Sequence, residues 1–268
     1  MKQIKRMTVL LITAALLLLT PVSALAAKKE YVPTKAIVYE LKDGNWVESD
    51  EETYSYTKNA RLKVFTTRSL TSSYTYKAAY TWKGNFLKKE DGSYYITTYS
   101  YKKKKLKSSS EVSKAFGSPT TISVSWKKRK GTFTSSNGDT GSITVNKRNQ
   151  MTNYTRVNSY GNKYTTTLKY FSNGNLKSES YSGPGYYYIY KYNRKGYPIS
   201  LRSDSDEATF KYKKNKKGQV TEQQITYKSN GGSVSNYKKV FSNWKKISRS
   251  VRNCDAFGHR VYTPYDFD

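Results

Sequence analysis

Cysteine and histidine are almost missing from this chain of 268 residues, which contains one of each, Cys254 and His259. A single cysteine excludes an intramolecular disulfide framework, and a Cys/His-rich zinc site needs about three or four such ligands. A cysteine–histidine nucleophile is also disfavoured, because we identify no third group that would orient the pair. We therefore expect no metal, no cofactor and no catalytic residues.

Acidic residues are scarce as well. The chain has 48 Lys and Arg against 19 Asp and Glu, which gives a formal net charge of +29. The acids cluster at residues 48–52 and 204–207 in turn-like contexts. There we expect them to be solvated and not to form the carboxylate pair of a glycoside hydrolase. A glycine-rich phosphate loop opening a helix is missing too, since residues 182–185 are typical of a turn. These absences predict a protein that is not an enzyme.

The one long apolar run lies at the N-terminus. Cationic residues precede the apolar residues 7–20, and the small-residue pattern of Ala24 and Ala26 follows. This order is typical of a secretory signal peptide, and the run is short for a membrane span, which needs about 20 residues. We expect cleavage after Ala26, with residues 1–26 as the signal peptide and residues 27–268 as one exported domain without a stable membrane anchor.

Aromatic residues, in contrast, are abundant: the chain has 27 Tyr, 9 Phe and 4 Trp. Many alternate with other residues, as Tyr186, Tyr188, Tyr190 and Tyr192 do. A period of two places such residues on one face of a strand, and tyrosine, threonine and valine favour strands. Helical signal is scarce after the signal peptide. The sequence therefore predicts an all-β domain.

Three glycines mark a repeat. Gly174, Gly196 and Gly218 are 22 residues apart, and each is preceded by aromatics and followed within three residues by an aliphatic side chain. This unit fits a β-hairpin whose tight turn needs Gly or Asn at positive φ. Each repeat would advance the sheet by two strands, or about 10 Å. We expect an antiparallel meander of repeated hairpins, and the sequence leaves open whether it is an open twisted sheet, a coiled wrap or two layers.

Two segments carry a family resemblance. Residues 190–199, Tyr-Lys-Tyr-Asn-Arg-Lys-Gly-Tyr-Pro-Ile, and residues 255–261, Asp-Ala-Phe-Gly-His-Arg-Val, resemble the YD repeats of bacterial RHS and teneurin-type proteins. The pattern of that family is roughly Tyr-Asp-x-x-Gly-Arg-Leu. The resemblance implies a secreted or surface-exposed wrap of β-hairpins.

Most clusters of Lys and Arg lie at the predicted turns of the repeats and not in the predicted strands. If the hairpins stack in register, these turns recur along one edge at intervals of about 10 Å and would suit an extended polyanion. The alternative is that lysine only keeps the edges soluble and unpaired. The net charge, however, exceeds the magnitude of about 2 to 8 that solubility asks of a small domain. The predicted polyanion-binding edge consists of Lys102, Lys103, Lys104, Lys105, Lys127, Lys128, Arg129, Lys130, Arg194, Lys195, Lys213, Lys214, Lys216 and Lys217.

The four tryptophans lie close to predicted turns. Exposed indoles there would stack on sugar rings, whereas buried ones would pack in the core. The candidates for glycan stacking are Trp46, Trp82, Trp126 and Trp244.

Together these features predict a secreted, non-catalytic binding or structural module at the bacterial surface. Its expected partner is an anionic cell-envelope polymer or acidic polysaccharide, with extracellular nucleic acid less favoured, and charge would hold it at the wall. Two alternatives stay open. One is a hydrolase or toxin-related enzyme with a site built from unmarked residues, and the other is a structural protein that self-associates through open sheet edges.

Overall fold

The computed structural model describes residues 30–57, 61–84 and 86–247. The predicted signal peptide with its cleavage site at Ala26, together with Cys254, His259 and residues 255–261, lies outside the described residues. Within the described part, no helix is long and apolar enough to cross a membrane.

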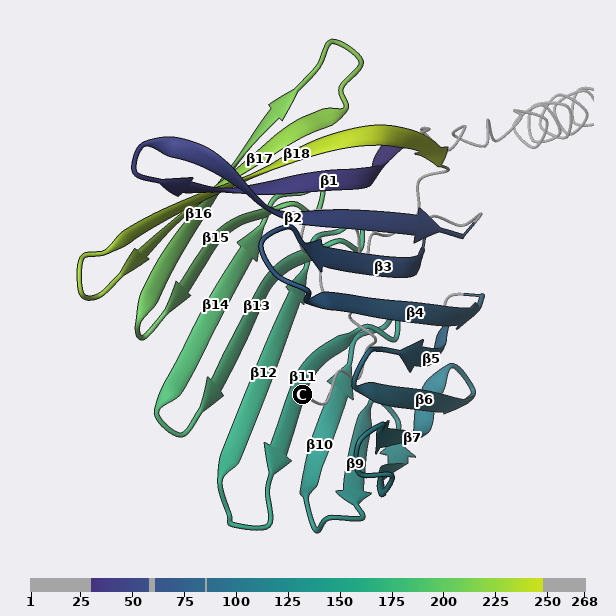
Figure 1. The fold of residues 1–268 in the computed structure, drawn as a ribbon. Helices are drawn as coiled ribbons and strands as arrows, with labels where there is room; N and C mark the ends of the chain where they lie inside the picture. Colours follow the sequence, from purple (N-terminus) through teal and green to yellow (C-terminus); the bar gives the residue numbers. More distant parts are fainter. Residues whose placement is uncertain (1–29, 58–60, 85, 248–268) are drawn as a thin grey trace, which may run out of the picture.

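The described chain forms one sheet of eighteen strands (Figure 1). Each strand pairs antiparallel with the strand before it and the strand after it in sequence. The strands are β1 (Glu30–Lys42), β2 (Asn45–Tyr56), β3 (Leu62–Ser69), β4 (Thr75–Lys83), β5 (Phe86–Asp91), β6 (Tyr95–Lys102), β7 (Lys105–Ser113), β8 (Pro119–Lys127), β9 (Lys130–Ser135), β10 (Thr140–Val145), β11 (Met151–Val157), β12 (Lys163–Tyr170), β13 (Leu176–Gly183), β14 (Tyr186–Tyr192), β15 (Pro198–Ser203), β16 (Asp206–Lys214), β17 (Val220–Ser229) and β18 (Val234–Ile247).

The first and last strands close this sheet into a barrel. Strand β1 pairs antiparallel with β18, from Glu30 opposite Ile247 to Glu40 opposite Tyr237. The expected open twisted sheet and the YD-like, RHS-like wrap of hairpins are therefore wrong. The physical reason is that an open meander leaves two edges of unpaired N–H and C=O groups, and pairing these edges with each other satisfies both.

Side chains on the two faces of the barrel differ in chemistry. On β12, Tyr164, Leu168 and Tyr170 are at least partly buried, whereas Lys163 and Lys169 are exposed. On β8, the partly buried residues Ile122, Val124 and Trp126 alternate with exposed Ser123, Ser125 and Lys127. The strands thus turn aromatic and aliphatic side chains inward and threonine, serine and lysine outward.

Because successive strands alternate in direction, every second connection lies at the same end of the barrel (Figure 1). We call one end the basic rim and the other the aromatic rim, and include in each the strand residues within two positions of its connections. The described connections of the basic rim are residues 57, 61, 84, 103–104, 128–129, 146–150, 171–175, 193–197 and 215–219. Those of the aromatic rim are residues 43–44, 70–74, 92–94, 114–118, 136–139, 158–162, 184–185, 204–205 and 230–233.

The core begins just inside the basic rim. After several of its connections, the chain places an aliphatic side chain inward, and these side chains are almost fully buried. They are Leu62, Leu87, Leu106, Met151 and Val220. Burying each such side chain contributes about 1.5–3 kcal/mol relative to leaving it exposed.

Aromatic side chains before the basic-rim connections tie neighbouring repeats together. The indole Nε1 of Trp82 donates to the carbonyl of Leu62, and that of Trp126 donates to the carbonyl of Leu106, both at 2.7 Å. The hydroxyl of Tyr170 makes the same kind of bond to the carbonyl of Met151 at 2.7 Å. We call these contacts aromatic clamps. In each clamp, donor and acceptor are 19 or 20 residues apart, which is close to the 22-residue repeat. The clamps therefore offer a structural reason for the sequence period.

A buried ion pair lies at the point of closure. Lys239 of β18 donates to both carboxylate oxygens of Glu52 of β2, at 2.8 and 2.9 Å. The hydroxyl of Tyr54 donates to the same carboxylate. Strand β1 lies between the two partners and pairs with both strands, so this ion pair spans the junction of the first and last strands.

Candidate functional site

Every residue of the predicted polyanion-binding edge lies on the basic rim, in or beside the connections β6–β7, β8–β9, β14–β15 and β16–β17. All of these side chains are exposed except Lys105, which is partly buried. The ammonium group of Lys105 lies 5.1 Å from the ring centroid of Trp126 and donates to the backbone carbonyl of Lys128. Lys105 therefore supports the rim. Of the exposed cations, Lys213 forms an ion pair with Glu222 at 2.9 Å, and the ammonium group of Lys214 lies 5.5 Å from the ring centroid of Tyr197.

The turns of the basic rim hold cations where turn chemistry favours other residues. Lys103 and Lys104 both have positive φ, at 51° and 64°. A two-residue turn of this kind prefers Asn-Gly or Asp-Gly, and the aromatic-rim turn β1–β2 has such a pair, Asp43 and Gly44. The left-handed conformation is costly for a residue with a Cβ atom, so lysine at both positions lowers the stability of this turn relative to Asn-Gly or Asp-Gly.

The longer connections also differ between the two rims, although they share one type of turn, which begins with an asparagine. In 193–197 the carboxamide Oδ1 of Asn193 accepts hydrogen bonds from the backbone of Lys195 and Tyr197, at 2.9 and 3.1 Å. Asn215 and Asn146 organise their connections in the same way. On the aromatic rim, Asn158 builds an equivalent turn. The two residues after the asparagine are cations in the three basic-rim turns and Ser-Tyr in the aromatic-rim turn.

The connections at the two ends of the barrel therefore differ in charge. The described connections of the basic rim contain no Asp or Glu. Among those of the aromatic rim, Lys114 is the one cation in the described chain, and it forms an ion pair with Asp91 at 2.8 Å. The exposed large side chains of the aromatic rim include Tyr94, Phe116 and Tyr160.

The tryptophans proposed for glycan stacking occupy different environments. Trp82 and Trp126 are half-buried in the aromatic clamps, and Trp244 packs against the core. Trp46 is 38% exposed and lies under the ammonium group of Lys238, 4.5 Å from its ring centroid. The structure does not bring the four indoles together into one sugar platform.

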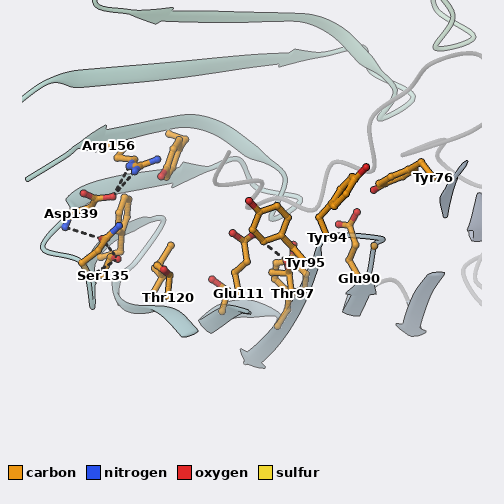
Figure 2. Close-up of a pocket in the computed structure, with 17 residues that line it drawn as sticks. Tyr76, Glu90, Tyr94, Tyr95, Thr97, Glu111, Thr120, Ser135, Asp139 and Arg156 are labelled. Atoms are coloured by element: carbon orange, nitrogen blue, oxygen red, sulfur yellow. Dashed lines mark hydrogen bonds and ion pairs between the residues drawn. The ribbon is translucent and has the colours of Figure 1, made fainter. Parts of the chain in front are cut away.

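A pocket that the sequence did not predict opens at the aromatic rim. It has a volume of about 320 Å³ and is lined by residues from β4 to β11 and their connections (Figure 2). Its polar lining includes Glu90, Glu111, Asp139 and Arg156. Tyrosines supply much of the wall, and burial raises the pKa of the Tyr154 hydroxyl, which keeps it protonated. We call this the tyrosine pocket. No local motif indicates it, because its residues are spread over some eighty positions of the sequence.

Inside the tyrosine pocket one ion pair is built into the wall. The guanidinium group of Arg156 contacts the carboxylate of Asp139 at 2.7 Å through both Nε and Nη2. The backbone N–H of Ser159 donates to the other oxygen of Asp139 at 3.2 Å. Asp139 is only 5% exposed, so its charge is compensated within the protein.

A second, larger hollow of about 590 Å³ lies inside the other half of the barrel, between β14 and β2. Its lining is mainly aromatic and aliphatic, with Asp50 and Lys239 as its ionisable groups besides tyrosine.

These features define the class of the described chain: an eighteen-stranded, up-and-down antiparallel barrel with a basic rim, an aromatic rim and internal hollows such as the tyrosine pocket. No protein-family model matches the chain. No curated protein is significantly similar to it in sequence.

Among solved structures, a porin-like protein from Bacteroides uniformis is 16% identical, with a TM-score of 0.39 over 80% of this chain and 97% of that chain. A porin-like protein from Bacteroides vulgatus is 7% identical, with a TM-score of 0.31 over 80% and 99% of the two chains. The TcdB2–TccC3 structure without its hypervariable C-terminal region is 12% identical, with a TM-score of 0.28 over 70% of this chain and only 13% of that chain. All three TM-scores are below 0.5, and the barrel is defined by its own strand pairing.

Proposed function

We propose that this protein is an exported, non-catalytic barrel that binds an anionic polymer of the cell envelope, a wall polymer or an acidic polysaccharide, along its basic rim. The observation that carries the proposal is the separation of charge between two ends built from the same turns. Solubility alone would place lysine at exposed turns of either end. Here, cations occupy most of the described turns of one end, including three positions with positive φ where lysine is unfavourable, Lys103, Lys104 and Lys128.

The spacing of the rim suits a polymer better than a small anion. Neighbouring strands are about 4.8 Å apart, so consecutive basic-rim connections are separated by about 10 Å. This distance is close to the Debye length of about 8 Å at physiological ionic strength, so each turn attracts a nearby charge while distant turns are screened. A flexible polyanion lying along the rim contacts several turns at once and releases several counterions, which a single small anion does not do.

The outer face of the barrel supports a water-exposed location. Outward positions carry lysine, serine and threonine, as on β8 and β12. A barrel embedded in a membrane instead has an outward apolar band about 25 Å tall. We therefore propose a location outside the cell, held at the wall by charge.

The test compares two variants that each lose four charges. The rim variant replaces Lys103, Lys104, Lys127 and Lys128 with glutamine, in two adjacent turns. The wall variant replaces Lys77, Lys163, Lys211 and Lys228 with glutamine, four exposed residues outside the basic rim. Binding to immobilised polyphosphate and polygalacturonate is measured between 50 and 300 mM salt, values set by the ionic-strength range over which screening changes strongly.

We expect the rim variant to bind at least about tenfold more weakly than the unmodified protein at about 0.15 M salt, with a shallower salt slope, because contacts with the anionic groups of the polymer are lost. The wall variant should change by less than about threefold, because its lysines are screened from the ligand. Equal losses in the two variants would contradict the proposal. Tighter binding to single-stranded DNA than to either polymer would replace the partner class with nucleic acid.

A further inference from the structure

We propose that the tyrosine pocket binds a small cationic polyol, specifically an amino sugar with a free amine. This site is independent of the basic rim and lies at the opposite end of the barrel. Three properties of the pocket support it: its size, the charge of Glu111, and a hydroxyl in the lining that is free to hydrogen-bond a ligand.

The size of the pocket fits one sugar ring. Its volume of about 320 Å³ lies at the lower end of the range of about 300–1,000 Å³ that is common for small-molecule sites. Phe133 and Tyr154 form its buried floor at 3% and 4% exposure. Tyr94 and Tyr95, labelled in Figure 2, line it at the aromatic-rim connection β5–β6, with about half of each residue exposed. A ligand therefore enters from the aromatic rim and meets tyrosine walls.

The pocket is negative within a strongly positive protein. Its lining holds three carboxylates, Glu90, Glu111 and Asp139, against the single guanidinium group of Arg156, which is already paired with Asp139. Glu111 accepts a hydrogen bond from the Thr97 hydroxyl at 3.2 Å, and no described residue forms an ion pair with it. The charge of Glu111 therefore favours a ligand that carries one positive charge.

The rings beside these carboxylates favour an ammonium group too. The ring centroids of Tyr76 and Tyr94 lie 6.2 Å apart, and Figure 2 shows both rings beside Glu90. Aromatic faces attract cations within about 6 Å of their centroids, and they also pack against the C–H face of an apolar or sugar ring. Among the described residues, no group of His, Cys, Asp and Glu could hold a metal ion, so the expected cation is organic.

A hydroxyl in the lining favours a polyol over a simple alkylammonium ion as the ligand. Ser109 lies on the inward face of β7, is 6% exposed and lines the pocket. No described residue hydrogen-bonds its side chain. Its hydroxyl is not among the sealed, unsatisfied polar atoms of the described residues, so it is accessible from the pocket and can hydrogen-bond a ligand that enters. Thr120 and Asn137 add further polar groups to the same lining.

The experiment measures binding of four probes by calorimetry and by chemical-shift changes: glucosamine, glucose, N-acetylglucosamine and choline. We expect glucosamine to bind at least about tenfold more tightly than glucose and N-acetylglucosamine, because only glucosamine combines the ring with a positive charge. Choline, a cation without a sugar ring, should also bind more weakly. Equal binding of glucosamine and glucose would overturn the role of charge, and choline binding as tightly as glucosamine would overturn the polyol.

Substitutions in the lining test whether glucosamine binds in this pocket. Glu111→Gln should weaken glucosamine binding at least about fivefold while leaving glucose unchanged, since it removes the charge and keeps the size of the side chain. Ser109→Ala should weaken glucosamine and glucose equally. The matched control is Glu207→Gln, a 62% exposed side chain on the outer face of β16. Loss in this control, or no loss in Glu111→Gln, would overturn the proposal. The rim variant should retain glucosamine binding, so this test fails independently of the polyanion test.

Discussion

Individual ionisable residues hold the connections of the aromatic rim in place. The carboxylate of Asp91 contacts Lys114 and Lys89, both at 2.8 Å. Hydrogen bonds from Lys114 and then Lys89 lower the pKa of Asp91 from 3.8 to about 2. A carboxyl group whose pKa is lowered on folding stabilises the fold above its unfolded pKa, and this contribution disappears as the pH falls through the folded value.

We therefore expect Asp91→Asn to lower the urea midpoint of unfolding at pH 6, where the carboxylate is charged in both states. The midpoints of the variant and the unmodified protein should converge as the pH falls from 3.8 to about 2. Urea titrations at several pH values check this. A difference that persists unchanged at the lowest pH would show that Asp91 acts through shape and not through charge.

Lys239 of β18 forms an ion pair with Glu52 of β2 across the junction that closes the barrel. Replacing it with methionine leaves the carboxylate of Glu52 without its cation, and both side chains are at most 18% exposed. Breaking a buried ion pair from one side costs about 3–5 kcal/mol, whereas removing both charges costs much less. Chemical denaturation should show that Lys239→Met is far less stable than the double variant with Glu52→Gln. A single variant as stable as the double one would mean that the pair is solvated and weak.

At the scale of the hairpin, the sequence predicted the turns well. Gly174, Gly196 and Gly218 have φ of 87°, 83° and 75°, as the hairpin interpretation requires. These positions were recognisable because a residue with positive φ leaves a local signature in composition. The aromatic clamps were not, because a hydrogen bond from Trp126 to the carbonyl of Leu106 depends on register between two hairpins.

The turn conformation gives a test at one glycine. A Cβ atom at Gly218 would meet no other atom within 4 Å, so the penalty for substitution comes from φ alone. We expect Gly218→Val to lose about 1–2 kcal/mol of unfolding free energy, and Gly218→Asn to lose clearly less, because asparagine tolerates the left-handed region. Similar losses for the two variants in urea titrations would contradict the turn geometry.

The clamps can be tested by removing a single donor. Trp126→Phe keeps an aromatic ring but leaves the carbonyl of Leu106 without its 2.7 Å hydrogen bond. The expected loss is about 1 kcal/mol, together with some packing. Trp46→Phe serves as the control because Trp46 is exposed on the outer face, and it should change stability by less than about 0.5 kcal/mol. A larger loss at Trp46 than at Trp126 would argue against the clamps.

At the scale of the whole molecule, the sequence failed where contacts are distant along the chain. Local periodicity places the cations in one phase of the repeats, and the structure gathers them on the basic rim. Closure was missed because Glu40 and Tyr237, which pair across the junction, have no local relation in the sequence. The tyrosine pocket was missed for the same reason: Tyr76 and Arg156 share its wall only after seven intervening strand pairings form.

Closure of the barrel creates the interior in which the tyrosine pocket lies and leaves no open edge for a wrap. The most direct test is hydrogen–deuterium exchange of the backbone amides of β1 and β18 in the native protein. If β1 pairs with β18 as well as with β2, both strands should be protected along residues 35–40 and 237–242 to the same degree as an interior strand such as β12. If either strand instead exchanged every second amide at the rate of an exposed edge, the barrel would be open and the account would be wrong.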